Sequence, residues 1–239
     1  MEQPIFCVAL PPEEALAYRM RAYHRNRVAE IVKGCTPFPM AEGAKLILHL
    51  IPDQSFASPT EFSADALGKA AQHSQPLGSS YSSSRYNADG FAIASLSGVK
   101  GYVQVFRNGT VETVMGDIVR KAQEPHQSNL LNALPIARLL KDGLPQYLRI
   151  FTALDVAPPV RCHLSLTGVK DCRILRGGEP SDHAIDRDIV EMPSGTATAL
   201  DVAGHVVLRP LLDVMWNSAG SPQCPYFNAM GLWEEPRHG

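Results

Sequence analysis

The amino-acid sequence predicts an α+β fold built on a mainly antiparallel sheet. Helical and strand-like patterns follow one another without the regular βαβ alternation that a parallel sheet requires. Near the middle, two β-rich runs flank Asn108-Gly109, and an Asn-Gly pair in that setting favours a type I′ hairpin turn, because both central residues must take a positive φ. We therefore expect a central hairpin, packed by an N-terminal basic helix, a long kinked middle helix and a C-terminal helix.

Apolar side chains recur at helical spacing in four segments, which we expect to be helices: 12–33, 64–73, 127–152 and 206–216. Gly34 stands where the first of them would stop. Pro135 and Pro145 must kink or divide the middle helix, and Pro210 must bend or shorten the last one. In the first helix Arg27 falls on the apolar stripe, where its charge must reach solvent or find a carboxylate partner.

Short apolar runs between turn residues predict the strands, which we expect at 45–51, 91–96, 102–106, 111–115, 160–166 and 187–192. The stretches 76–90 and 167–185 are typical of loops, since they are rich in glycine and in serine or charged residues. No linker is long enough to force a boundary, so we expect a single α+β domain over 1–239, with irregular tails at 1–14 and 219–239.

Composition excludes several classes of protein. The 239 residues are 45% hydrophobic, enough for a sizeable core, and the net charge is −2, so nucleic acid would need a local basic patch. The five cysteines are scattered without C-x-x-C spacing, which argues against a disulfide framework or zinc ribbon. The N-terminal residues lack the features of a signal peptide, and no apolar stretch is long enough to span a bilayer. We expect a cytoplasmic protein with no membrane contact.

Four stretches together resemble one family. They are YRMRAYHRNRVAEIVKGCTPFPMAEGAKLILHLIP at 18–52, GSSYSSSRYNADG at 78–90, GYVQVFRNGTVE at 101–112 and LSLTGV at 164–169. In this order they look like the C-terminal region of bacterial Schlafen/AlbA-type proteins, which are described as DNA-binding, helix-turn-helix proteins. In that family an AlbA-type domain precedes this region, whereas here only a short segment does. The resemblance implies either a fragment or a domain that stands alone and serves a partner.

The resemblance thus implies a non-enzymatic accessory, sensor or partner-binding domain in a nucleic-acid or phage-defence setting. Its expected partner is another protein or the missing N-terminal domain, and nucleic acid and a second copy of the chain stay open as partners. One alternative is an enzyme, a nuclease or nucleotide-processing one, with a site assembled from distant residues. Another is a structural oligomerisation module. The sequence assigns no catalytic residue, no cofactor and no metal ligand.

Two candidate binding sites stand out. Arg19, Arg21 and Arg25 in the first helix can bind phosphates, since guanidinium groups match phosphate oxygens; the alternative is a solvated helix face. The second is the loop from Gly78 to Gly90, whose small residues and arginine suit a phosphate or a base; the alternative is a flexible loop. The residues singled out in this loop are Ser79, Ser80, Arg85, Asn87 and Asp89.

Other polar residues carry weaker signals. The eight histidines show no metal-binding spacing, and an alternating strand puts Cys162 and His163 on opposite faces. We interpret His49 and His163 as buried strand histidines bonded to backbone or to a carboxylate. The acidic group Asp182, Asp186 and Asp188 is typical of a surface loop rather than a magnesium site.

Overall fold

The computed structural model describes residues 11–235 apart from 59, 80–81, 97–98, 125 and 177. Its helices are α1 (Pro12–Val32), α2 (Asp53–Ala57), α3 (Ala64–Ala71), α4 (Ala133–Ala153) and α5 (Gly204–Asn217). The strands of the main sheet are β1 (Lys45–Pro52), β2 (Ser82–Asn87), β3 (Gly90–Ser95), β4 (Gly101–Phe106), β5 (Val111–Met115), β8 (Val160–Thr167), β11 (Ile189–Glu191) and β12 (Gly195–Ala197). A small sheet holds β6 (Val119–Arg120), β7 (Leu130–Leu131), β9 (Arg173–Arg176) and β10 (Glu179–Pro180).

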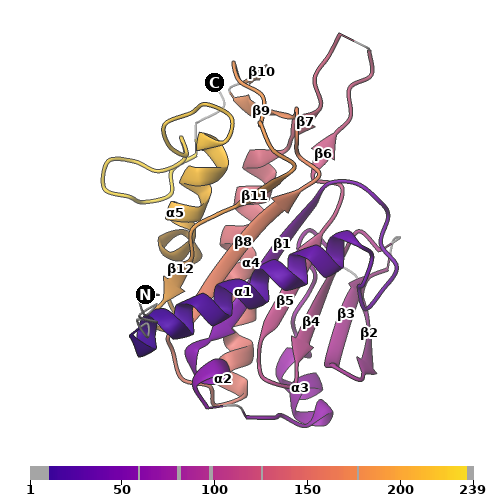
Figure 1. The fold of residues 1–239 in the computed structure, drawn as a ribbon, viewed down its shortest axis with the longest axis vertical. Helices are drawn as coiled ribbons and strands as arrows, with labels where there is room; N and C mark the ends of the chain where they lie inside the picture. The colour runs from indigo at the N-terminus through magenta and orange to yellow at the C-terminus, as the bar shows by residue number, and fades with distance from the viewer. Residues whose placement is uncertain are drawn as a thin grey trace, which may run out of the picture.

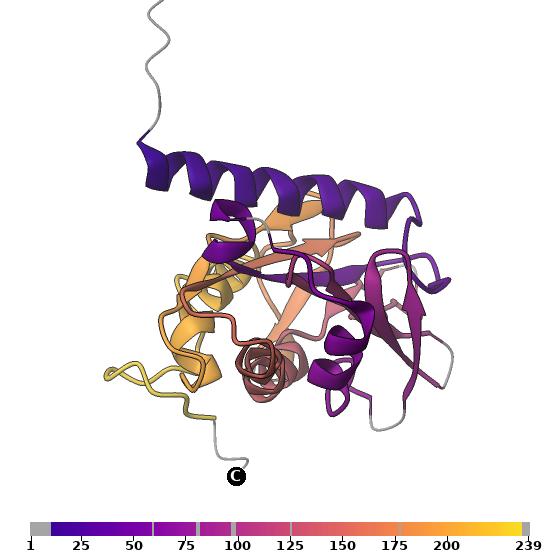
Figure 2. The ribbon, with the colours of Figure 1, turned by 90° about the horizontal axis from the view of Figure 1, so that it is seen from below.

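The main sheet confirms the predicted fold class. Its strands run in the order β11-β8-β1-β5-β4-β3-β2, with β12 also paired to β8, and every pairing in it is antiparallel (Figure 1). Helix α1 lies across one face of the sheet, while α3, α4 and α5 lie on the other (Figure 2). Among the described residues, no helix combines the length and hydrophobicity needed to cross a bilayer.

The two faces of the sheet carry different chemistry, because successive side chains of a strand point to opposite faces. On β1, Leu46, Leu48 and Leu50 belong to the large apolar core that includes α4 and α5. Ile47 belongs to a small apolar cluster that also contains Val28 of α1. The large core therefore anchors the fold on the α4 side, and the α1 side is left with room for polar residues.

Several predicted boundaries were wrong. The stretch 76–90 contains β2, an exposed strand at the edge of the sheet, and edge strands need not be apolar. The stretch 167–185 contains β9 and β10. The middle helix begins at Ala133, after β7, and continues through Pro145 as one helix. The helix predicted at 12–33 is confirmed by α1, so residues 12–14 do not belong to an irregular tail, and α2 was not predicted.

The central hairpin is confirmed between β4 and β5, but its turn is not type I′. Gly109 has φ 85°, whereas Asn108 is not among the residues with positive φ. The Gly109 N–H donates to the carbonyl of Phe106 at 2.8 Å, and the Thr110 N–H donates to Oδ1 of Asn108 at 3.0 Å. The Asn108 side chain thus stabilises a longer loop in which only the glycine needs the left-handed region.

We predict that Gly109→Ala destabilises the fold by about 1–2 kcal/mol, because a Cβ disfavours positive φ. The added Cβ would also lie 3.1 Å from a ring carbon of Phe62. The matched control is Gly116→Ala, whose φ is not positive and whose Cβ would meet its nearest atom at 3.4 Å. Thermal melting measures the stability of both variants. Equal melting temperatures would show that the positive φ of Gly109 does not require glycine.

Candidate functional site

A group of polar side chains lies between α1 and the sheet. We call it the α1 polar cluster. Its members come from α1, β1, β4, β5 and β8: His24, Arg27, His49, Tyr102, Glu112, His163 and Ser165. Helix α1 contributes to it because its fully buried residues, Met20, His24, Val28 and Ile31, follow a helical spacing that points one stripe at the sheet.

The carboxylate of Glu112 is the centre of the cluster. It is fully buried and receives two hydrogen bonds from Arg27, Nε to Oε2 and Nη2 to Oε1, each 3.0 Å long. The hydroxyl of Tyr102 donates to Oε1 at 2.7 Å, and Nε2 of His49 lies 2.8 Å from Oε2. Burial acts to raise the pKa of Glu112, but the bonds and charges of His49 and Arg27 outweigh it and lower the pKa to about 2. Glu112 is therefore an anion at neutral pH.

A chain of hydrogen bonds leads from Glu112 to β8. Since the Glu112 carboxylate only accepts, Nε2 of His49 must donate to it. Nδ1 of His49 lies 2.6 Å from Nδ1 of His24, and Nε2 of His24 lies 2.8 Å from the Ser165 hydroxyl. Which nitrogen of each ring carries a proton along this chain, and hence which atom donates in each bond, depends on the tautomers of His24 and His49. One serine hydroxyl is thus linked to one carboxylate through two histidines.

His163 belongs to the cluster through a ring contact, and no hydrogen bond joins it to the other members in the described structure. Its ring stacks on His24 with 5.4 Å between centroids, and its Nε2 is buried without a hydrogen-bond partner in the described structure. Burial, then the charges of His49, Arg21 and Arg161, lower the pKa of His163 to about 4. Burial, followed by His49, His163 and Arg25, lowers the pKa of His24 well below its usual value. Both rings are accordingly neutral at neutral pH.

The cluster fixes α1 to the sheet, and in this conformation it is closed to substrates. Ser165 is 1% exposed, and His24 and His49 are fully buried. In the parts of the chain that the structure describes, no group of three or more His, Cys, Asp or Glu side chains is placed to hold a metal ion. The chemistry available to the cluster as it stands is proton sharing along its hydrogen bonds.

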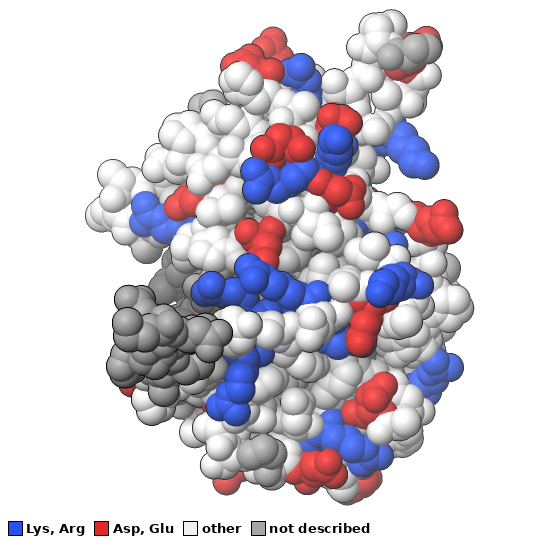
Figure 3. Space-filling model, in the orientation of Figure 1, with Lys and Arg blue, Asp and Glu red and all other residues white. Residues whose placement is uncertain are grey.

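The arginines predicted to bind phosphate lie on parts of α1 that solvent reaches. All three are exposed, and basic side chains form a band over α1 in Figure 3. Arg25 is committed to an ion pair with Glu191 of β11, with 2.7 Å between Nε and Oε2. Within the described ranges, Arg19 and Arg21 have no ion-pair partner. Two of the three predicted residues are therefore available to a ligand.

The predicted ligand loop is mostly edge strand. The Arg85 guanidinium donates to the Pro37 carbonyl and lies over the Phe38 ring, 4.5 Å from its centroid. Nδ2 of Asn87 donates to Gln104 at 2.7 Å, and Oδ1 of Asn87 accepts from the Gly90 N–H at 2.8 Å, which gives the expected turn onto Gly90. Asp89 is exposed at this turn, Ser79 lies before the strand, and Ser80 falls outside the described residues. Of the described residues of this loop, Arg85 and Asn87 are thus each bonded to another part of the protein.

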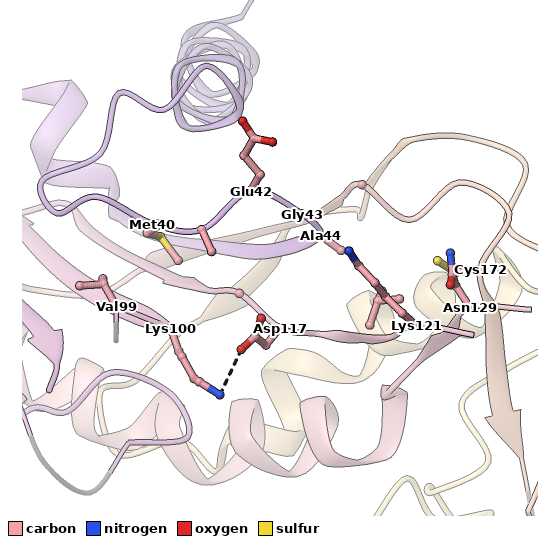
Figure 4. A pocket seen from close by; sticks show the side chains of 14 residues that line it. Met40, Glu42, Gly43, Ala44, Val99, Lys100, Asp117, Lys121, Asn129 and Cys172 are labelled. Carbon is pink, nitrogen blue, oxygen red and sulfur yellow. Dashed lines mark ion pairs between the residues drawn. The ribbon is translucent and has the colours of Figure 1, made fainter. Parts of the chain in front are cut away.

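A cleft of about 370 Å³ lies elsewhere, between the main sheet and the small sheet (Figure 4). Its wall combines apolar side chains, glycines and a few polar groups; among them are Met40, Val99, Lys100, Asp117, Lys121 and Asn129. Lys100 and Asp117 form an ion pair with 3.2 Å between Nζ and Oδ2. No pattern in the sequence marks this cleft, because its residues come from loops far apart along the chain.

Part of the polar cluster was foreseen and part was missed. Arg27 has the carboxylate partner that its place on the apolar stripe required, and His49 is a buried strand histidine bonded to a carboxylate, as interpreted. Glu112 and Ser165 were missed. The available signal for Glu112 was its position within the apolar strand VETVM, beside the hairpin.

The comparisons with known proteins add no relative: no family model matches the chain, and neither a curated protein nor a solved structure matches it.

We predict that Glu112→Gln destabilises the fold by about 3–5 kcal/mol, because the partly buried Arg27 loses its buried anion and the new N–H₂ group faces other donors. The matched control is Glu191→Gln, which breaks the exposed pair with Arg25 and should cost less than about 1 kcal/mol. Urea denaturation measures both. Similar losses of unfolding free energy in the two variants would show that the buried carboxylate stabilises the fold no more than the exposed one.

We further predict that the protein loses stability as the pH falls from about 6.5 toward 4. His24 and His163 have lowered pKa values when folded, so the unfolded chain binds protons first and is favoured as the pH falls. The loss from Glu112 comes later, between its usual pKa of 4.5 and about 2. His163→Phe should reduce the slope of the unfolding free energy by up to about 1.4 kcal/mol per pH unit in the first window. The exposed His73, changed to Phe, is the control, and an unaltered slope in His163→Phe would refute the prediction.

Proposed function

We propose that this chain is a non-enzymatic, partner-binding accessory domain of the Schlafen/AlbA type, and that exposed arginines of α1 contact nucleic acid. The observation that carries the proposal is that α1 is bonded to the sheet by some of its side chains and exposes others that have no partner. Its inward side is bonded to the sheet through Arg27 and His24, while Arg19 and Arg21 are exposed and have no ion-pair partners among the described residues. A helix fixed in this way holds the backbone positions of its exposed arginines, whose guanidinium groups suit phosphate oxygens.

The α1 polar cluster is formed largely by the stretches on which the resemblance rests. His24, Arg27 and His49 come from the first stretch that resembles the family, and the Tyr102–Glu112 pair comes from the third. The fourth stretch supplies Ser165. Stretches that lie far apart in sequence and carry the resemblance thus meet at one buried site. The wider setting, nucleic-acid regulation or phage defence, rests on the resemblance alone.

We predict that the chain binds nucleic acid at low salt and that Arg19→Ala/Arg21→Ala weakens this binding. Each phosphate contact that is lost should flatten the slope of log K against log salt by roughly 0.9 for duplex DNA. Fluorescence anisotropy with single- and double-stranded DNA and RNA provides the measurement. The control is Arg120→Ala/Arg149→Ala, which removes two exposed arginines outside α1, one of them on α4 across the sheet. Absence of binding to all four nucleic acids would end the nucleic-acid part of the proposal.

A second candidate, an enzyme with a site assembled from distant residues, is favoured by one observation. The Ser165 hydroxyl faces His24, which leads through His49 to Glu112, and a base held by a further group is the arrangement that activates a serine. The test is labelling with a fluorophosphonate, with Ser165→Ala as the control. Modification of Ser165 in the folded protein would favour the enzyme over the accessory domain.

A further inference from the structure

The cleft between the two sheets contains polar groups whose hydrogen-bonding capacity points to a type of ligand. Of its two carboxylates, Asp117 is held by Lys100, and Glu42 is turned away from the other labelled side chains toward the end of α1 (Figure 4). Lys121 instead reaches across toward Gly43 and Ala44 (Figure 4), and it has no ion-pair partner among the described residues. The cleft thus presents one uncommitted ammonium group, whereas its carboxylates are paired or turned aside.

Asn129 adds a second donor. Its Oδ1 accepts a hydrogen bond from the Ala122 N–H at 3.0 Å. This bond fixes the orientation of the amide, because only the oxygen can accept from an N–H donor. Nδ2 of Asn129 is therefore left as a donor, and the described structure gives it no acceptor. Lys121 and Asn129, both exposed to solvent, are thus two donors of the cleft that can bind an acceptor atom.

The remaining wall of the cleft is apolar or backbone. Met40, Val99 and Val119 provide apolar surface, and the space beside Gly43 is open, since a Cβ built there would meet no atom within 4 Å. Cys172 also lines the cleft, and burial raises the pKa of its thiol, so this group is a neutral thiol rather than a nucleophile. A volume of about 370 Å³ lies within the range of small-molecule sites, roughly 300–1,000 Å³.

We propose that this cleft binds a small organic anion, a phosphate or carboxylate attached to a compact apolar group. The anionic oxygens accept hydrogen bonds from Lys121 and Asn129, and the apolar part lies against Met40, Val99 and Val119. Donors that lack an acceptor, next to apolar surface, recognise this kind of molecule and not a cation. The proposal goes beyond nucleic-acid contact by α1 and does not depend on it, because none of its residues belongs to that helix.

The experiment follows the backbone amides of Gly43, Gly116 and Gly168, which line the cleft, by nuclear magnetic resonance. Three probes are titrated: adenosine 5′-monophosphate, phenylacetate and uncharged adenosine. We expect saturable shifts of these glycine signals with at least one of the two anions and none with adenosine. The anion that gives the shifts distinguishes a phosphate site from a carboxylate site.

Lys121→Ala should weaken the binding of the active anion at least about tenfold, which corresponds to 1.4 kcal/mol. Because Lys121 is exposed, this variant should melt like the parent protein. Lys69→Ala, which removes an exposed lysine from α3, is the matched control and should bind like the parent. Failure of both anions to shift the glycine signals, equal shifts with adenosine, or unchanged affinity in Lys121→Ala would each overturn the proposal. These outcomes are independent of whether Arg19 and Arg21 bind nucleic acid.

Discussion

Glu112 carries a full negative charge inside the protein, and the arrangement of α1 depends on how that charge is compensated. A buried carboxylate is tolerated only when charges and hydrogen-bond donors surround it. Here the donors come from three different elements: Arg27 from α1, His49 from β1 and Tyr102 from β4. The charge can be satisfied only when the helix and the two strands are in register, so it specifies one position of α1 on the sheet.

This constraint explains how a helix with few apolar residues packs against a sheet. Only four side chains of α1 are fully buried, and one of them is His24. The apolar contacts alone permit the helix to slide or rotate, because apolar attraction has little directionality. Directional bonds from Arg27 and His24 remove that freedom, and the exposed pair between Arg25 and Glu191 adds a tether near the sheet edge. Stability and position therefore come from different interactions.

The sequence predicted those features that depend on local pattern. The apolar runs located β1, β5 and β8, and the place of Arg27 on the stripe of α1 required a partner for its charge. The identity of that partner was beyond reach, because 85 residues separate Arg27 from Glu112 and only the sheet register brings them together. Strand β2 was missed for a related reason: as an edge strand it needs no apolar face, so its serines resemble a loop. The cleft is invisible in the sequence because loops from both sheets form it.

The two proposed sites are related by the segment that follows α1. The chain leaves the helix at Val32 and lines the cleft with Met40 and Gly43 before it enters β1, the strand that carries His49. Phe38 and Pro37 in this segment also hold Arg85 of the edge strand. A ligand in the cleft would thus contact a segment whose two ends are both fixed by the polar cluster, since α1 and β1 each bond to Glu112. Because contacts at both ends restrict its movement, the segment holds Met40 and Gly43 in place at the cleft through the same bonds that hold α1 on the sheet.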